Sequence, residues 1–252
     1  MELIENINYG AESVDERLTR NKERFSEIRK RSHTKYHTET SELVKNTKVI
    51  EDGTVYLKDI DIKQETRLIA SDPIQVALTL GIIFNHKTAI LNFADIMDVG
   101  GLVFEGSIGT EAEYCRVTNL YESLSSGVAI NGFYERSRKS TTSSIVLYSP
   151  TTAIIRSELA DEWFDEPEFV DFISIADAES EELLISRLKS AAGVVLNEGI
   201  QLLVISITSK EQAMCVRSVL SQYKICPKIA FVCSDIDTYN EVEEILGDSY
   251  GK

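Results

Sequence analysis

Cysteine and histidine are scarce in this sequence of 252 residues, and long apolar runs are absent. The four cysteines are scattered and form no CxxC pair, which argues against a disulfide framework and against a structural zinc site. No apolar run approaches the roughly 20 residues that span a bilayer. The acidic start, MELIENINYGAESVDER, lacks the basic and apolar regions of a signal peptide. We therefore expect a cytoplasmic protein that does not associate with membranes.

The three histidines give little support to hydrolytic or metal chemistry. A Ser/His/Asp triad needs a histidine beside a nucleophile, and none of the three lies beside a G-x-S-x-G elbow. His33 and His37 lie four residues apart, but no Glu-rich or Cys-rich segment nearby completes a ligand set. We interpret both as surface residues, and we predict neither a metal site nor a cofactor.

The charge is strongly acidic, because 26 lysines and arginines face 41 aspartates and glutamates, a net charge of −15. Such a surface repels nucleic-acid phosphate, so nucleic acid is not an expected partner. One region, residues 17–35, is basic. We interpret it as the solvated face of a helix, and a contact with nucleic acid or another anionic partner is the alternative.

The order of helical and apolar segments predicts an α/β fold. The predicted helices cover residues 14–31, 73–85, 110–124, 179–197 and 238–246, with one more after Ser209. The predicted strands cover residues 47–50, 54–62, 67–70, 88–93, 143–148, 152–155, 169–175, 201–207 and 228–233. Residues 32–42 are predicted to form a loop, and Asp52-Gly53 a turn between the first two strands. Apolar strands that alternate with helices imply a largely parallel sheet with helices on both faces.

Capping signals mark two of these helices clearly. Ser13-Val-Asp-Glu16 is a capping box, and Asp72-Pro73-Ile74-Gln75 combines an Asp cap with proline at the first helical position. We expect an N-terminal helical extension, residues 1–45, followed by one α/β domain, residues 46–252.

The segment 89–124 carries the main functional signal. A buried-type strand, Ala89–Phe93, leads into a loop with glycines at 100, 101, 106 and 109, and the next helix opens with acidic residues. Glycines let a backbone approach a ligand closely, and loop amides beside a helix N-terminus favour anions. Loops after the carboxyl ends of strands are also where open α/β sheets bind ligands. These residues alone leave phosphate-ester binding and a plain connector equally open.

Several short motifs in and after this segment match one known family. They are Asn92-Phe93-Ala94, Gly100-Gly101, Arg116, Leu120-Tyr121 and Tyr148-Ser149-Pro150, with Gly106 at the position of a spacer glycine. They resemble the bacterial-type poly(ADP-ribose) glycohydrolase family, whose pattern is approximately N-F-A-x-A-x-x-P-G-G-G, a spacer and then Q-E-E. That family is a branch of the macrodomain fold. The resemblance implies a macrodomain-like three-layer α/β/α fold with a mixed, largely parallel sheet.

The sequence departs from the family pattern at the position of the catalytic acid. The Q-E-E triplet aligns with Thr110-Glu111-Ala112, and in the family the second glutamate is the catalytic acid, which protonates the leaving ribose oxygen. An alanine cannot do this. Leu102 replaces the third glycine and Val99 the usual proline. The second glycine-rich loop of the family is replaced by residues 208–212, which read as a helix start.

The resemblance implies an ADP-ribose pocket that contains Asn92, Asp98, Gly100, Gly101 and Glu111. We expect a protein that binds ADP-ribose or a related nucleotide and has no glycohydrolase activity. One alternative is a scaffold for protein interaction or assembly, in which Leu102 and Met97 fill the ligand volume. The other is a residual glycohydrolase that uses Glu111 or Glu105 as its acid.

Overall fold

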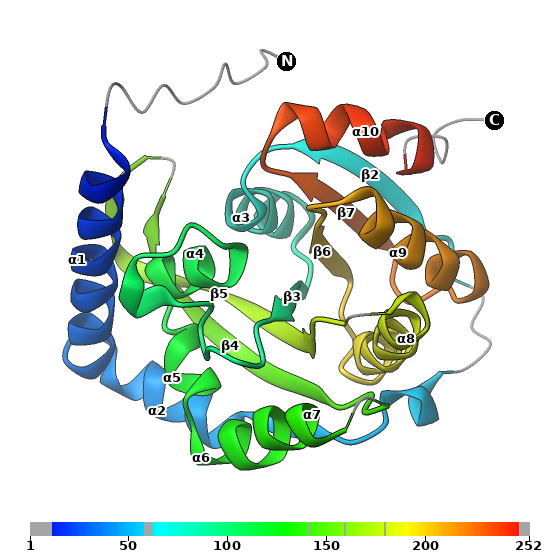
Figure 1. Ribbon diagram of the computed structural model, residues 1–252, viewed down its shortest axis with the longest axis horizontal. Coiled ribbons are helices and arrows are strands. Elements are labelled where there is room, and N and C mark those ends of the chain that lie inside the picture. The colour runs from blue at the N-terminus through cyan, green and yellow to red at the C-terminus, as the bar shows by residue number, and fades with distance from the viewer. Residues whose placement is uncertain (1–11, 58–61, 141, 159, 179, 247–252) are drawn as a thin grey trace.

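A seven-stranded mixed sheet organises the molecule (Figure 1). The computed structural model describes residues 12–57, 62–140, 142–158, 160–178 and 180–246. The strands are β1 (Lys48–Ile50), β2 (Glu65–Ala70), β3 (Thr88–Ala94), β4 (Val146–Ser157), β5 (Glu162–Ala176), β6 (Leu202–Ser206) and β7 (Lys228–Cys233). Their order is β1-β4-β5-β3-β6-β7-β2. The pairs β1–β4 and β4–β5 are antiparallel, and all others are parallel.

Helices cover both faces of this sheet and make three layers (Figure 1). On one face lie α8 (Glu181–Asn197), α9 (Lys210–Gln222) and α10 (Ile236–Leu246). The other face carries α1 (Val14–His33), α2 (His37–Asn46), α3 (Pro73–Phe84), α4 (Thr110–Val117), α5 (Leu120–Leu124), α6 (Gly127–Ala129) and α7 (Glu135–Lys139). Two 3-10 turns, Gly53–Tyr56 and Val103–Glu105, and a π-helical turn, Ile130–Tyr134, complete the described elements. The predicted macrodomain-like α/β/α fold is confirmed.

Residue alternation along β3 builds the two cores. Ala89 and Leu91 pack under α8 and α9, whereas Ile90 and Ala94 pack under the opposite layer. Successive side chains of a strand point to opposite faces, so a strand covered on both sides must be apolar throughout. Two polar residues interrupt this pattern on β3: Thr88 at its start, and Asn92 in its interior, which is 1 % exposed.

The helix starts follow their predicted caps. The Ser13 side chain accepts from the Glu16 amide while Glu16 reaches back to the Ser13 amide, which completes the capping box of α1. The Asp72 carboxylate accepts from the Gln75 amide at 2.7 Å and begins α3. Both helices therefore start where the sequence predicts.

The loop predicted over residues 32–42 is wrong, because α2 begins at His37. Tyr36, Thr40 and Leu43 are buried and lie at helical spacing, and α2 packs on β4. This stripe contains a threonine and few aliphatic residues, so its period was not visible as an apolar pattern.

The strand predicted from residue 54 is also wrong in its described part, which is the 3-10 turn Gly53–Tyr56. A Cβ on Gly53 would lie 2.0 Å from the Ser190 carbonyl oxygen, and the Gly53 amide donates to the Ser190 hydroxyl at 2.6 Å. Gly53 therefore serves a close approach to α8 and not a hairpin turn. Residues 58–61 of that predicted strand lie outside the described residues.

Two further predictions need revision in their boundaries. The helix predicted over 110–124 is two helices, α4 and α5, separated at Thr118 and Asn119. The two strands predicted over 143–155 are one strand, β4, with a register shift between Ser149 and Thr152. Pro150 lies in that irregularity, where its missing N–H leaves no ladder bond broken.

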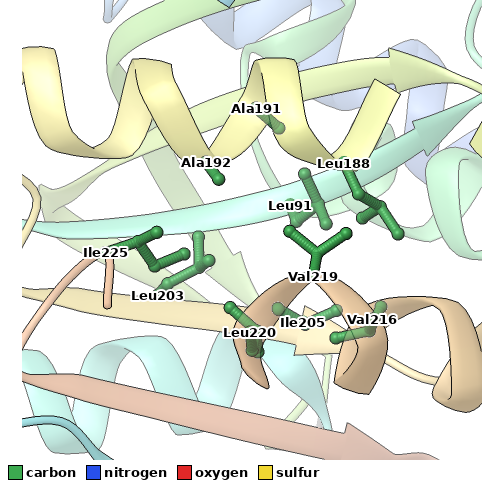
Figure 2. Close-up of a pocket in the computed structure, with 10 residues that line it drawn as sticks. All are labelled: Leu91, Leu188, Ala191, Ala192, Leu203, Ile205, Val216, Val219, Leu220 and Ile225. Atoms are coloured by element: carbon green, nitrogen blue, oxygen red, sulfur yellow. The ribbon is translucent and has the colours of Figure 1, made fainter. Parts of the chain in front are cut away.

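Figure 2 shows a small apolar cavity between α8, α9 and the sheet. Its volume is about 20 Å³, and ten apolar side chains line it, among them Leu91, Ala192 and Val219. An apolar cavity of this size stays dry. It is a packing defect of the α8–α9 layer, and no residue of the loop after β3 lines it.

The N-terminal helices α1 and α2 pack against elements that follow residue 45 in the sequence. In the described residues, α1 contacts α4 and the 103–105 turn, and α2 contacts β4 and α5. The division at residue 45 stays a prediction. None of the described helices is long and apolar enough to cross a lipid bilayer.

Candidate functional site

The candidate site lies where β3, β5 and β6 reach the same edge of the sheet (Figure 1). The chain leaves β3 toward α4 on one face, whereas β5 and β6 lead to α8 and α9 on the other. Such a reversal opens a crevice beyond the strand ends, the usual ligand position in open α/β sheets. The Asp177 amide donates to the Ala94 carbonyl at 3.1 Å and keeps the β3 and β5 ends together.

Three consecutive residues of the loop adopt the left-handed conformation. The φ angles are 80° at Gly100, 61° at Gly101 and 60° at Leu102. A Cβ on Gly100 would lie 2.9 Å from the Tyr121 ring, so this glycine is also required by packing. Leu102 stands at the position of the third glycine in the family pattern, in a left-handed conformation that its side chain disfavours.

Gly106 serves the protein's own packing. A Cβ there would lie 2.3 Å from the Leu18 carbonyl oxygen of α1, and the Asn21 side chain donates to the Gly106 carbonyl at 2.9 Å. The expected close approach of this glycine to a ligand is therefore wrong, because its near neighbour is α1.

The Glu111 carboxylate is buried beneath this loop and held by donors from three directions. Asn92 Nδ2 donates to Glu111 Oε1 at 2.8 Å, and the Asp95 amide donates to Oε2 at 3.2 Å. The Gly100 amide also bonds to this carboxyl group. Glu111 is 5 % exposed, and burial raises its pKa to about 8, against these donors, which lower it.

The structure brings together four of the five predicted site residues. Asn92, Gly100, Gly101 and Glu111 adjoin one another, since a Cβ on Gly101 would lie 3.4 Å from Glu111 Cβ. Asp98 is exposed, and its backbone, not its side chain, joins the local hydrogen bonds.

Position 112 carries an alanine, which is completely buried and supplies no carboxylate. Its neighbour Glu113 lies among Arg116, Asp72 and Glu158, and burial raises the pKa of Glu113 to about 7. Glu105 points to α1, with its carboxylate 3.6 Å from Lys22 Nζ. Neither glutamate contacts the Glu111 network in the described structure.

Sequence reasoning missed Tyr134. This side chain is completely buried, and its hydroxyl has no hydrogen-bond partner among the described residues. The charges that act on the hydroxyl are first those of Glu111 and then of Cys115 and Asp95. Only the aromatic pair Phe133-Tyr134, in a stretch without a recognised motif, could have drawn attention to it.

The segment after β6 is a capped helix start, as its sequence predicts. Ser209 Oγ accepts from the Gln212 amide at 3.2 Å, and Gln212 Oε1 accepts from the Thr208 amide at 2.8 Å. The first bond caps α9 and the second ties Gln212 to the residue before the cap, so a capped helix start occupies the chain at the point where the family pattern has its second glycine-rich loop.

The basic stretch of α1 is matched by the protein's own acids. Its ion pairs include Arg20–Glu12, Lys22–Glu105, Arg24–Glu158, Arg24–Asp161, Arg29–Glu122, Lys30–Glu27 and Arg31–Glu27. Lys35 donates to the Asp165 carbonyl, and Arg31 stacks over the Trp163 ring at 4.0 Å. Much of the positive charge of this stretch is therefore paired with acidic groups of the protein itself, including Glu158 and Asp161 of the β4–β5 hairpin. Within the described ranges, no three acidic, cysteine or histidine side chains are grouped to hold a metal ion.

Comparison with known proteins identifies the fold. Poly(ADP-ribose) glycohydrolase (PARG) from Thermomonospora curvata superposes with a TM-score of 0.78 at 16% identity, over 92% of this chain and 100% of that one. PARG from Deinococcus radiodurans in complex with ADP-ribose gives a TM-score of 0.73 at 18% identity, over 83% and 97%. The T. curvata protein bound to the inhibitor ADP-HPD gives 0.76 at 16% identity, over 92% and 100%. At these identities the likeness is one of fold.

No curated protein sequence matches the chain. The family model described as the microbial-type PARG catalytic domain matches residues 10–157, more than half of the sequence. That match includes the strand, loop and helix of the candidate site, and it confirms the predicted resemblance. The chain therefore belongs to the microbial-type PARG catalytic domain family.

Proposed function

We propose that this protein binds ADP-ribose or a related nucleotide at the loop after β3 and does not hydrolyse ADP-ribosyl bonds. The observation that carries the proposal is the Asn92–Glu111 pair beneath the Gly100–Gly101 loop, with Ala112 at the next position. The left-handed loop over Gly100 and Gly101 is present, and the acid that the family resemblance assigns to protonation is missing.

The geometry of Glu111 supports the absence of hydrolysis. Each of its oxygens accepts an N–H donor, so the protein itself holds this carboxyl group in place. A general acid must instead direct a proton to the leaving oxygen within hydrogen-bond distance. We infer that Glu111 shapes the loop and contributes one wall of the pocket.

Calorimetric titration of the full chain with ADP-ribose tests binding. We expect saturable heat and a raised melting temperature at millimolar ligand, because a ligand that binds only the folded state stabilises it. No heat and no thermal shift would overturn the binding proposal. Incubation with an ADP-ribosylated protein tests hydrolysis. We expect no release of ADP-ribose. Release that Glu111→Gln abolishes would establish the residual glycohydrolase instead.

An interaction scaffold is the second candidate, and the exposed apolar residues of the loop favour it. Met97 is 72% exposed and Leu102 is 45% exposed, and Phe104 and Ile108 are exposed beside them. These exposed side chains offer an apolar surface to a protein partner, and the filling of the ligand volume by Met97 and Leu102 stays a prediction of this second candidate. Loss of ADP-ribose binding together with a stable complex with a protein partner would favour this function. The cytoplasmic location stays a prediction.

A further inference from the structure

The outer edge of β2 is open in the part of the chain that the structure describes. There β2 pairs only with β7, and none of its six residues is buried (Figure 1). The amides of Glu65 and Ser71 donate to carbonyls of the β7 segment at 2.8 and 3.1 Å. Since backbone groups alternate sides along a strand, those of Thr66, Leu68 and Ala70 face away from β7. Such a row of outward donors and acceptors is a template for another extended chain.

Edge strands are usually protected against such pairing, and β2 lacks two of the common protections. It contains no proline, and its register with β7 runs from Glu65 to Ala70 without a bulge. Helix α10 packs against one face of β2, whereas on the other face α3 lies mainly over β6, β3 and β7. The α3 side of β2 is therefore the side on which a partner has room.

A shallow groove lies on this side, between α3 and the β2–β7 pair, and its rim is cationic. Leu80 and Phe84 contribute apolar surface, and the charged residues that line it are Glu65, Arg67 and Lys228. Lys228 Nζ lies 4.3 Å from the centroid of the Phe84 ring and 3.0 Å from the Glu65 carboxylate. Arg67 is exposed and has no ion-pair partner within the described ranges. The acid of the groove is thus already paired, and Arg67 supplies a positive charge that an acidic partner can meet.

The end of α3 adds apolar surface beside this rim. Ile82 and Ile83 are each 65% exposed. Ile83 follows Leu80 by three residues and directly precedes Phe84, so it lies next to the groove on the helix surface. A partner that fits this surface combines carboxylates with apolar side chains in one extended segment.

Charge separates this partner from two other candidates. Two copies of the chain joined edge to edge at β2 would bring their cationic rims together, which is unfavourable. Nucleic acid would be repelled by the net charge of −15. An acidic peptide also meets that charge, but the strand edge offers it a row of backbone hydrogen bonds.

We propose that β2 and the groove beside α3 bind an extended acidic segment of a partner protein. The segment adds to the sheet through the backbone of Thr66, Leu68 and Ala70, and its carboxylates lie against Arg67. In strand addition the main chain supplies affinity, and alternate side chains supply specificity. Strands β6 and β7 separate this edge from β3, so binding of the segment leaves the candidate nucleotide site accessible.

Fluorescence anisotropy of the full chain with two short labelled peptides tests the proposal. One peptide alternates valine with glutamate, and the other alternates valine with lysine. We expect saturable binding of the glutamate peptide and about tenfold weaker binding of the lysine peptide. The net charge of the protein favours the opposite order. Equal affinities, or a preference for the lysine peptide, would overturn the proposal.

Two variants and a control locate the binding surface. Arg67→Glu should weaken the glutamate peptide about tenfold. Lys45→Glu reverses an exposed cation of α2, which packs on β4 near the other end of the sheet, and should leave the affinity within about twofold. Leu68→Pro removes an outward N–H, which an edge strand tolerates, and should abolish peptide binding. Unchanged peptide affinity in Arg67→Glu or in Leu68→Pro would contradict the assignment. ADP-ribose affinity should be the same in all variants, so this inference and the proposed function fail separately.

A change in the probe covers the case in which Leu68→Pro does not fold. A glutamate peptide with N-methylated backbone amides cannot pair as a strand, and the wild-type chain should bind it about tenfold more weakly. Equal affinity for the methylated and unmethylated peptides would overturn strand addition. Sedimentation equilibrium without peptide addresses the second copy. We expect no association through β2, and a dimer that Leu68→Pro dissociates would show that a second copy occupies the edge instead.

Discussion

Leu102 is a single residue that keeps the backbone of a glycine loop without its glycine. Its φ of 60° lies in the left-handed region, directly after two glycines in the same conformation. An L-residue there is strained by about 1–2 kcal/mol. Backbone hydrogen bonds of the loop hold the turn in this conformation. One of them runs from the Glu105 amide to the Leu102 carbonyl at 2.9 Å.

Replacing Leu102 by glycine should therefore stabilise the fold. We expect Leu102→Gly to raise the free energy of unfolding by about 0.5 kcal/mol relative to Leu102→Ala, because the relief of strain exceeds the added entropy of the unfolded chain. Urea unfolding of both variants measures this difference. The alanine variant also removes the exposed side chain but keeps the strain, so a glycine variant less stable than alanine would contradict the prediction.

At the scale of elements, α1 acts as a clamp on the site loop. Leu18 and Asn21 hold Gly106, and Phe25 packs edge-on against Phe104 with ring centroids 4.9 Å apart. Phe104 in turn packs against Tyr121, whose ring also contacts Gly100. The loop conformation thus depends on a helix about 85 residues away in the sequence.

Gly106→Ala tests this clamp. The new Cβ would overlap the Leu18 carbonyl oxygen at 2.3 Å, and the φ of 80° adds strain. We expect the variant to lose roughly 2–3 kcal/mol of stability, with faster hydrogen exchange in α1. Gly127→Ala is the control, because nothing lies within 4 Å of its Cβ and it lies in α6, where alanine is favoured. Equal stability of the two variants would mean that α1 does not clamp the loop.

At the scale of the whole molecule, buried carboxyl groups set the pH dependence of stability. The folded pKa values of Glu111 and Glu113 are about 8 and about 7, above the ordinary value of 4.5. The folded state therefore binds more protons than the unfolded state over this range, and stability falls as pH rises. Glu111 contributes most, because Glu113 retains 39 % of its side-chain exposure.

Denaturant unfolding between pH 5 and pH 8 should show this fall, on the order of 3 kcal/mol for Glu111. In Glu111→Gln the slope should be shallower and should end near pH 7, where Glu113 has titrated. The absolute stability of Glu111→Gln should also be lower. The NH₂ group of the glutamine would face an N–H donor, either that of Asn92 or that of the backbone, where an oxygen now accepts. A wild-type stability that rises over this range would contradict the assignment.

The sequence predicted the parts of the fold that rest on local patterns. The caps at Ser13 and Asp72 and the apolar strand at residues 88–93 all lie where the pattern indicated. The site was predictable as a strand, a loop and a helix for the same reason, and the family pattern placed Asn92 and Glu111 in one pocket without indicating the hydrogen bond between them.

Features that depend on distant packing were not predictable. Helix α2 was missed because threonine supplies part of its buried stripe. The partner of Gly106 is in α1, and the partner of Gly53 is in α8, so the sequence around each glycine indicates only a close approach and not what approaches. The π-helical turn Ile130–Tyr134 was not predicted either, because no local sequence pattern marks such a turn.

The position of β2 at the edge of the sheet sets a limit on when the protein can fold during synthesis. Glu65 of β2 and Lys228 of β7 are 163 residues apart and pair in register, while β2 has no other strand neighbour. At about 5–20 residues per second, a ribosome needs roughly 10–30 s between making these two strands. The strand β2 stays without its partner for that time, whereas β3 pairs with β5 and β6, which are made earlier. A nascent chain is therefore open to strand-mediated aggregation, and chaperone holding should matter more for this protein than for one whose neighbouring strands follow each other in the sequence.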